Sequence, residues 1–238
     1  MLEKIKELPK FELVEIKTID EQEIKRFRAV REIESKEIIT IVSSKYKLVQ
    51  FEEVFMPLAL SFDYKILETF YYRGKAMLEM WNENNVGIIA RNSVDKSLAI
   101  HIRYAVKENG YIFILRGFRR LHVGKAKTDL KTIFSAIDKL KEIWNNLLVE
   151  LKNTEVNLSE FEKELKLPKK LKEEIQLKRS SKMLKGEIYS YYDLWIDSIN
   201  FYRKKRYKSE IKRMEMIEKV CDRILDVLKP KALDLLFS

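Results

Sequence analysis

The sequence is poor in the residues that define several common classes of protein. Its 238 residues include one cysteine, two histidines, four prolines and six glycines. The single cysteine, Cys221, excludes an intramolecular disulfide framework and a cysteine-based zinc site. Two histidines are too few for a metal site built from histidine ligands. The glycines show neither the G-x-G-x-x-G nor the G-x-x-x-x-G-K-[ST] spacing of phosphate-binding loops.

Long apolar segments are also missing. The longest apolar run, residues 54–60, has seven residues with Pro57 included, whereas a membrane-spanning helix needs about 20. The first residues carry charges where a signal peptide requires an apolar core. We therefore expect no membrane partner and a location in a reducing compartment, the cytoplasm.

The residues that are abundant are apolar and charged ones. The chain is 46% hydrophobic and 35% charged, a balance that favours a folded chain over a disordered one. Lysine, glutamate and isoleucine are frequent and glutamine occurs only three times. This composition fits a heat-adapted protein, that is, one from a thermophile, whose surface carries many ion pairs.

The positive charge is confined to the second half of the chain. The formal net charge is +10; residues 1–115 hold 18 basic and 18 acidic residues, and residues 116–238 hold 29 and 19. A charge distribution of this kind creates a directed field and favours a polyanionic partner. The excess is concentrated in segments 116–131, 163–185 and 203–213.

Two of these basic segments invite different interpretations. In segment 163–185 the basic residues are interspersed with acidic ones, so we favour a solvated surface, with Pro168 marking a linker. Residues 203–206, Arg-Lys-Lys-Arg, lie between Tyr202 and Tyr207. Cations and stacking surfaces alternate in this way in single-stranded nucleic-acid grooves, although a solvated helix surface explains the segment equally well.

The hydrophobic pattern predicts an α+β fold. Short segments rich in β-branched and aromatic residues are separated by turn signals such as Asn109-Gly110, which favours a meandering antiparallel sheet. One amphipathic helix, 50–62, interrupts them. The predicted strands are 11–16, 26–33, 37–43, 46–50, 65–72, 75–81, 86–91, 97–106 and 111–116.

After residue 116 the apolar period becomes 3.6, which predicts helices packed against that sheet. We expect the sheet and the first long helix to form one α+β domain, residues 1–155, with a helical C-terminal region, residues 156–238, packed on it. The predicted helices are 126–151, a short helix capped by Ser159, one starting at Pro168, one carrying 184–202, and one from the Ser209 cap to 228.

Several short motifs follow one another in the order of a known family. Arg28-Ala-Val-Arg31 precedes segment 41–50, and further on come Asn92-Ser-Val-Asp-Lys-Ser-Leu-Ala99, Arg119-Arg-Leu-His122 and the aromatic segment from Ser190 to Arg213. In this order, over residues 25–228, the chain resembles the domain-of-unknown-function 932 family of phages and plasmids, a family whose role is not settled.

The resemblance implies a virus or plasmid protein acting in the host cytoplasm. The family's layout is similar to that of phage single-strand annealing proteins. Two features depart from the family pattern: Val94 and Lys96 stand where the family has His and Gly, and its Cys-x-Asn pair is absent from 111–121. Any chemistry that these positions perform in relatives is expected to be lost.

Candidate catalytic groups are few. Of the E-x-K triplets, only Glu15-Ile-Lys17 closes a predicted strand, with Asp20 downstream. Glu79 and Asp95 would offer Mg²⁺ two carboxylates, fewer oxygen ligands than it needs. His101 lies in a predicted strand, where we expect a structural or solvent-facing role.

We therefore expect a non-enzymatic, single-stranded nucleic-acid-binding protein, with strand annealing as one candidate activity and no cofactor or metal. Two alternatives stay open: an interaction or assembly module, which would form oligomers through the aromatic stripe of 191–202, and a metal-dependent nuclease. The predicted binding residues are Arg116, Arg119, Arg120, His122, Lys125, Lys127, Arg203, Lys204, Lys205 and Arg206, with Tyr71 and Tyr207 stacking on bases.

Overall fold

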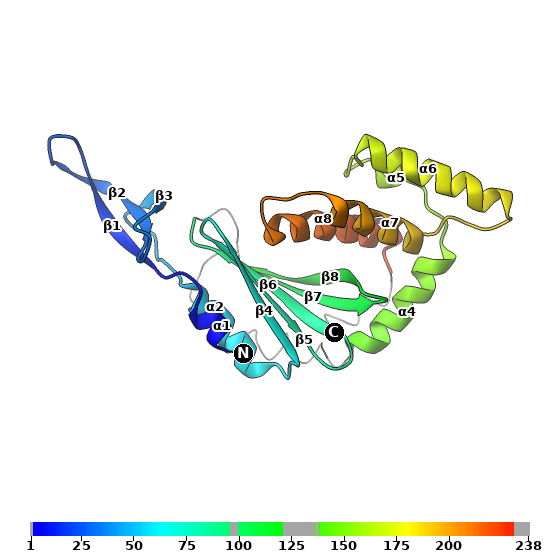
Figure 1. The fold of residues 1–238 in the computed structure, drawn as a ribbon, viewed down its shortest axis with the longest axis horizontal. Helices are drawn as coiled ribbons and strands as arrows, with labels where there is room; N and C mark the ends of the chain where they lie inside the picture. Colours follow the sequence, from blue (N-terminus) through cyan, green and yellow to red (C-terminus); the bar gives the residue numbers. More distant parts are fainter. Residues whose placement is uncertain (1, 96–99, 121–136, 138, 231–238) are drawn as a thin grey trace. The chain divides into compact units, whose positions relative to one another are not determined.

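The structure, a computed structural model, describes residues 2–95, 100–120, 137 and 139–230, with the backbone alone for 119 and 120. It confirms the predicted α+β fold (Figure 1). The described residues form two antiparallel sheets, and most of the helical residues lie in the C-terminal half of the chain. Among these residues, no helix is both long enough and apolar enough to cross a bilayer.

The first three strands form a sheet of their own, where the sequence had suggested one continuous meander. They are β1 (Phe11–Lys17), β2 (Glu23–Glu32) and β3 (Ile38–Ser43), paired in the order β1-β2-β3. The predicted strand 46–50 is wrong, because its last residue, Gln50, caps the next helix. The Gln50 side chain also accepts a hydrogen bond from the Phe11 amide at 3.1 Å and donates one to the Phe11 carbonyl at 2.8 Å.

The second sheet is the predicted meander. Its strands are β4 (Ile66–Tyr72), β5 (Lys75–Trp81), β6 (Val86–Ser93), β7 (Ile100–Glu108) and β8 (Tyr111–Arg120), in sequential order. Asn109 and Gly110 join β7 to β8 with φ angles of 50° and 78°. Two successive residues with positive φ are the requirement of the tight hairpin turn that an Asn-Gly pair favours.

The chain forms two compact units, and the division between them runs through the sheet, between Arg103 and Tyr104 and between Arg116 and Gly117. The structure thus divides the chain differently from the boundary expected at residue 155. The first unit contains α1 (Glu3–Lys6), β1 to β5, α2 (Phe51–Ser61) and most of β6. Its core includes a ring cluster formed by Phe11, Phe51, Phe55 and Tyr71.

The second unit contains residues 104–116 of β7 and β8, whose other residues belong to the first unit. It also contains the C-terminal helices: α4 (Leu140–Asn153), α5 (Leu158–Phe161), α6 (Lys169–Leu184), α7 (Tyr191–Lys204) and α8 (Glu210–Leu228). Its core is centred on Trp195 of α7, whose ring contacts Phe113 at 4.8 Å and Trp144 at 5.7 Å between centroids. The Trp195 Nε1 donates to the Ile112 carbonyl at 3.3 Å, which joins α7 to β8.

Helix ends test the predictions from capping. The Ser209 cap of α8 is confirmed, since its Oγ accepts from the Lys212 amide. For α5 the predicted cap is wrong: Asn157, and not Ser159, accepts from the Glu160 amide. Pro168 is the cap of α6, a helix of 16 residues, so the linker interpretation of segment 163–185 is also wrong.

Two predicted helices have different limits in the structure. The predicted helix 184–202 belongs to two elements, because Leu184 ends α6 and Ser190 caps α7 with a full capping box. For the predicted helix 126–151, residues 126–136 and 138 lie outside the described residues, and α4 covers the C-terminal part.

Candidate nucleic-acid interface

The strongest concentration of unneutralised charge among the described residues lies where α7 meets α8. We call residues 203–208, Arg-Lys-Lys-Arg-Tyr-Lys, the basic turn. Helix α7 ends within it at Lys204, the C-cap Lys205 has an extended backbone, and α8 follows the Ser209 cap. The side chains of all five cations are exposed: Arg203, Lys204, Lys205, Arg206 and Lys208.

Among the residues that the structure describes, the basic turn has no acidic counterpart. Within the described part of the chain, none of its five cations forms an ion pair. The next carboxylate along the chain, Glu210, is already paired with Arg213 at 2.6 Å. The charge of the turn is therefore available to a polyanion, as the sequence-based hypothesis requires of Arg203, Lys204, Lys205 and Arg206.

Arg203 fixes the position of the turn on the sheet. Its Nη2 donates to the Gly110 carbonyl at 2.5 Å, and its guanidinium carbon lies 5.0 Å from the centroid of the Tyr111 ring. The β7–β8 hairpin and the end of α7 are thus joined by a hydrogen bond and a cation–π contact. Sequence reasoning did not identify Tyr111 or Gly110, because the contact joins residues more than 90 positions apart.

Of the aromatic rings beside the turn, Tyr202 is buried, Phe201 lies under a lysine and Tyr207 is half-buried. The Lys205 Nζ lies 4.4 Å from the Phe201 ring centroid and 5.9 Å from that of Tyr202. Tyr202 is buried, and this burial, together with the neighbouring Tyr207, raises the pKa of its hydroxyl to about 12. Tyr207 itself is half-buried, which raises its pKa as well.

The other predicted binding residues do not join the turn. Arg116 on β8 is neutralised, since its Nη2 lies 2.7 Å from Oδ1 of Asp226 in α8. The side chains of Arg119 and Arg120, and the whole of His122, Lys125 and Lys127, lie outside the described residues.

Tyr71, expected to stack on bases, belongs to the first unit and has structural contacts there. Its hydroxyl donates to Oε2 of Glu32 at 2.9 Å and accepts from the Gly74 amide at 3.1 Å. Its ring is part of the cluster with Phe11 and Phe51. Burial, with a smaller contribution from the bond to Glu32, raises the pKa of this hydroxyl to about 12. Tyr71 is therefore no open stacking surface.

The basic segment 163–185 differs from the turn, because several of its cations pair with carboxylates of other elements. Lys182 Nζ lies 2.8 Å from Oδ2 of Asp193, Arg179 Nη2 lies 3.0 Å from Oε1 of Glu155, and Lys178 pairs with the buried Asp197. The sequence predicts a solvated surface here, but it does not predict these pairs with distant carboxylates.

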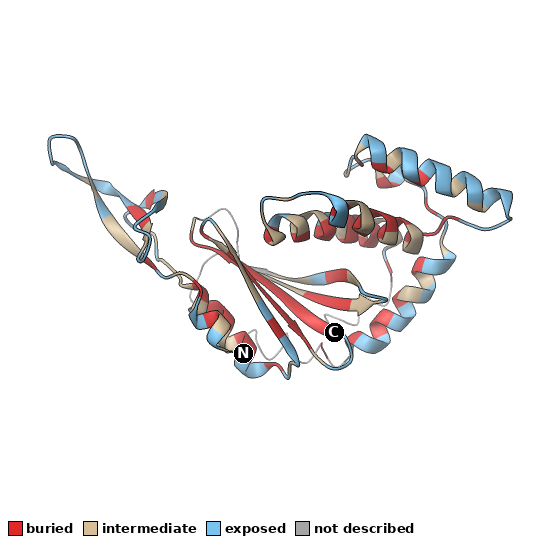
Figure 2. Ribbon diagram, viewed as in Figure 1, coloured by how far each residue is buried: buried red, intermediate tan, exposed pale blue. Residues whose placement is uncertain are grey.

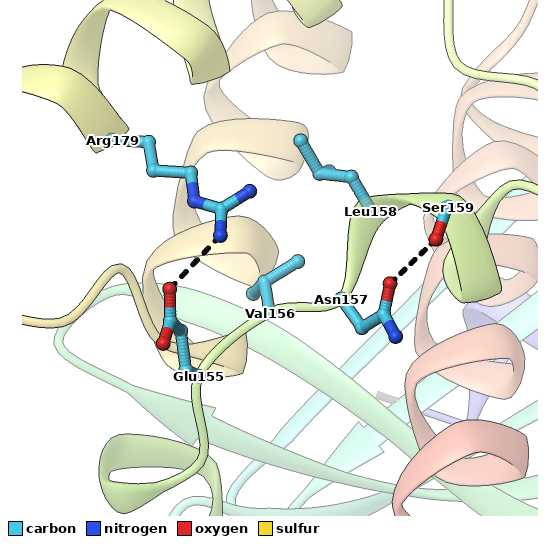
Figure 3. Close-up of a pocket in the computed structure, with 6 residues that line it drawn as sticks. All are labelled: Glu155, Val156, Asn157, Leu158, Ser159 and Arg179. Atoms are coloured by element: carbon cyan, nitrogen blue, oxygen red, sulfur yellow. Dashed lines mark hydrogen bonds and ion pairs between the residues drawn. The ribbon is translucent and has the colours of Figure 1, made fainter.

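A polar cavity of about 450 Å³ lies beside one of these pairs (Figure 3). It is lined by residues 155–159, which run from the connection after α4 into α5, and by Arg179 of α6. The Glu155–Arg179 pair closes one side, and the Asn157 carboxamide accepts from the Ser159 hydroxyl at 2.8 Å on the other. Both contacts join lining residues to each other, so they hold the walls of the cavity in place.

Among the described residues, no three His, Cys, Asp or Glu side chains come together as a metal site would require. Glu79 is buried and accepts a 3.4 Å hydrogen bond from the Trp81 indole. The Nδ1 atom of His101 lies 3.3 Å from Nη2 of the buried Arg91, a contact in keeping with a structural role.

Comparisons with family models, curated proteins and solved structures found no match to this chain. The resemblance to the domain-of-unknown-function 932 family therefore stays a hypothesis.

Proposed function

We propose that this protein binds nucleic acid through the basic turn. The observation that supports the proposal is the group of five exposed cations within six residues, none of them paired with a carboxylate among the described residues. Like charges held so close together repel one another, and no carboxylate of the described residues offsets this repulsion. A phosphate backbone would supply the missing negative charge.

Lys208 adds to this argument. It directly precedes the Ser209 cap of α8, and the N-terminus of a helix carries partial positive charge that disfavours a cation. The stability of the fold therefore gives no reason for a lysine at this position, whereas a phosphate-binding turn does.

Binding through such a turn would release counterions from the nucleic acid. The logarithm of the binding constant should then fall linearly with the logarithm of the salt concentration, by about 0.7 for each phosphate neutralised on a single strand. The sequence predicts a preference for single strands, and a titration with single-stranded and duplex oligonucleotides tests that preference.

The decisive experiment reverses the charge of the turn. Lys204, Lys205, Arg206 and Lys208 are changed to Glu, while Arg203 is kept because it holds the turn against Gly110. We expect binding of a labelled single-stranded oligonucleotide to fall by more than about tenfold and the salt slope to become shallower.

A matched control changes Lys163, Lys166, Lys170 and Lys185 to Glu, which alters the net charge equally in and around α6. This control should bind within about threefold of the parent. Both variants lose the same net positive charge, so the weaker long-range attraction to the oligonucleotide affects them equally. If the two variants lose the same affinity, or if the turn variant binds like the parent, the proposal is overturned.

An assembly role is the second candidate. The aromatic stripe expected to mediate it is unsuitable, because Tyr191, Trp195, Ile199 and Tyr202 are buried within the chain. Instead, one side of the β1–β3 sheet exposes Phe27, Ile38 and Ile41, at 48%, 49% and 62%. Light scattering over a range of protein concentrations, without nucleic acid, would show association of the parent and its loss in the Ile41→Thr variant.

A further inference from the structure

The rings beside the basic turn offer little free face to a base: Tyr111 and Phe201 each lie under a cation, and Tyr207 is half-buried. The guanidinium of Arg203 lies over Tyr111, whose ring also makes an edge contact with Trp195 at 6.3 Å between centroids. The ammonium of Lys205 lies over Phe201, whose ring makes an edge contact with Tyr202 at 5.5 Å. Base stacking on a protein requires an aromatic face that the base can cover.

Uncovering Tyr111 would disrupt the turn itself. For a base to replace Arg203 over Tyr111, the guanidinium would have to leave the Gly110 carbonyl, the contact that fixes the turn on the β7–β8 hairpin. The buried Tyr202 cannot be uncovered without opening the core of the second unit. The cations and the rings therefore form one surface, in which Arg203 and Lys205 each lie over an aromatic ring.

A cation supported in this way keeps most of its hydrogen-bond donors. A guanidinium that lies over a ring still points its N–H groups outward in its own plane, toward an approaching phosphate. Arg203 uses one of its nitrogens for Gly110. Lys205 has three N–H donors, and Lys204, Arg206 and Lys208 are exposed beside it.

We infer that the basic turn recognises the phosphate backbone and not the bases, so that its ligands are phosphodiester polyanions of any sequence, single-stranded or duplex. This inference rests on the proposed function and specifies its ligand class. It also replaces the base-stacking mechanism expected from the sequence. A duplex should bind at least as tightly as a single strand at low salt, because its charge density is higher.

The test uses three oligonucleotides of about 16 nucleotides, the upper range of a small single-strand site: a mixed-sequence single strand, a single strand of the same length made of abasic sugar-phosphate units, and a duplex. The full-length protein is titrated with each at the same salt concentration. We expect the abasic strand to bind within about threefold of the mixed-sequence strand, because both present the same phosphates.

The outcomes separate the two proposals. If the mixed-sequence strand binds more than about tenfold more tightly than the abasic strand, bases contribute to binding and the inference is overturned. If none of the three binds, or if the charge-reversed turn binds all three as the parent does, the proposed function itself fails.

Two ring variants provide an independent readout. Phe201→Leu and Tyr111→Leu remove rings that base stacking would need, and stacking on either would make the variant bind from about fivefold to more than a hundredfold more weakly. Phosphate recognition predicts a change of no more than about twofold for Phe201→Leu. The Phe201 ring is only half-buried, so its loss should leave the fold intact. Circular dichroism identifies unfolding of the Tyr111 variant, and in that case Phe201→Leu decides the question.

Discussion

Helix α6 and the basic turn are both rich in cations, but they differ in whether those cations have carboxylate partners. Four cations of α6 pair with carboxylates of α7 or of the segments that follow α4 and α5, whereas the cations of the turn face solvent. Counting charges along the chain does not separate the two cases. The difference teaches that a basic segment points to a polyanionic partner only when the folded chain leaves it without carboxylates.

The burial of the two helices explains why α6 needs those ion pairs. Figure 2 shows α6 exposed along most of its length, whereas α7 carries a largely buried face. The buried residues of α6 are only Leu171 and Ile175, against seven in α7. Because α6 buries so little apolar area, we infer that it depends on its ion pairs for attachment to the rest of the second unit. These pairs would then contribute more to stability than isolated surface pairs usually do.

The largest effect is expected from Asp197→Ala, which removes the buried carboxylate that joins α6 to α7. Asp197 accepts a hydrogen bond from the Tyr189 hydroxyl at 2.8 Å and pairs with Lys178. Its loss leaves a buried hydroxyl unsatisfied and should lower the free energy of unfolding by about 1–3 kcal/mol. Lys178 is 56% exposed and can be solvated again, which limits the loss.

Urea unfolding measures this change, with Glu173→Ala as the matched control. Glu173 forms an exposed pair with Lys169 within α6, at 4.0 Å, and its removal should change stability by no more than about 0.5 kcal/mol. Equal losses in the two variants would contradict the view that contacts to α7 hold α6 in place.

A smaller, pH-dependent effect is expected from Asp193→Asn. Partial burial tends to raise the pKa of Asp193, but hydrogen bonds from Lys182 and from the Ser190 amide and hydroxyl lower it below its usual value of 3.8. The folded pKa is lower than the unfolded one, so the carboxylate stabilises the fold above pH 3.8 and loses this effect as the pH falls through its folded pKa.

The variant should therefore be less stable than the parent by about 1 kcal/mol at neutral pH, since it loses the ion pair and part of the α7 capping box. This difference should shrink as the pH is lowered from 5 to 3, as followed by denaturant unfolding at each pH. A difference that stays constant over this range would show that the charge of Asp193 does not contribute.

The smallest effect has the opposite sign. Lys208→Glu replaces a cation with an anion next to the N-terminus of α8 and reduces repulsion in the basic turn, so it should stabilise the chain by about 0.5 kcal/mol. The same change should weaken binding to nucleic acid. Lys185→Glu is the contrasting control, because Lys185 is the C-cap of α6 and its positive charge interacts favourably with the negative end of the helix dipole. This variant should therefore lose stability. Loss of stability in both variants would show that Lys208 serves the fold.

Local patterns identified most of the elements correctly. Strand β5 was predicted with its observed limits, the Asn109-Gly110 turn adopts the positive φ angles that its residues favour, and Ser209 caps α8. Such features depend on residues a few positions apart, which is why they can be recognised in a sequence. The capping of α5 was assigned to Ser159 in place of Asn157, because two residues with capping side chains stand close together.

The candidate site was predictable only in part. The run of cations in 203–206 was visible, but its anchor on Gly110 and the ion pair that neutralises Arg116 join residues about 90 and 110 positions apart. No local pattern reports contacts of this range. The same limit applied to Tyr71, whose residue type suits base stacking but whose position in the fold gives it structural partners.

The amino-acid sequence by itself determined the α+β class, the order of the strands in the larger sheet and the positions of most turns and caps, because short-range sterics and apolar periodicity control them. The tertiary structure alone decided which cations have carboxylate partners and which rings have a free face. Both depend on where distant segments meet, since ion pairs and ring contacts require atoms within a few ångströms of one another.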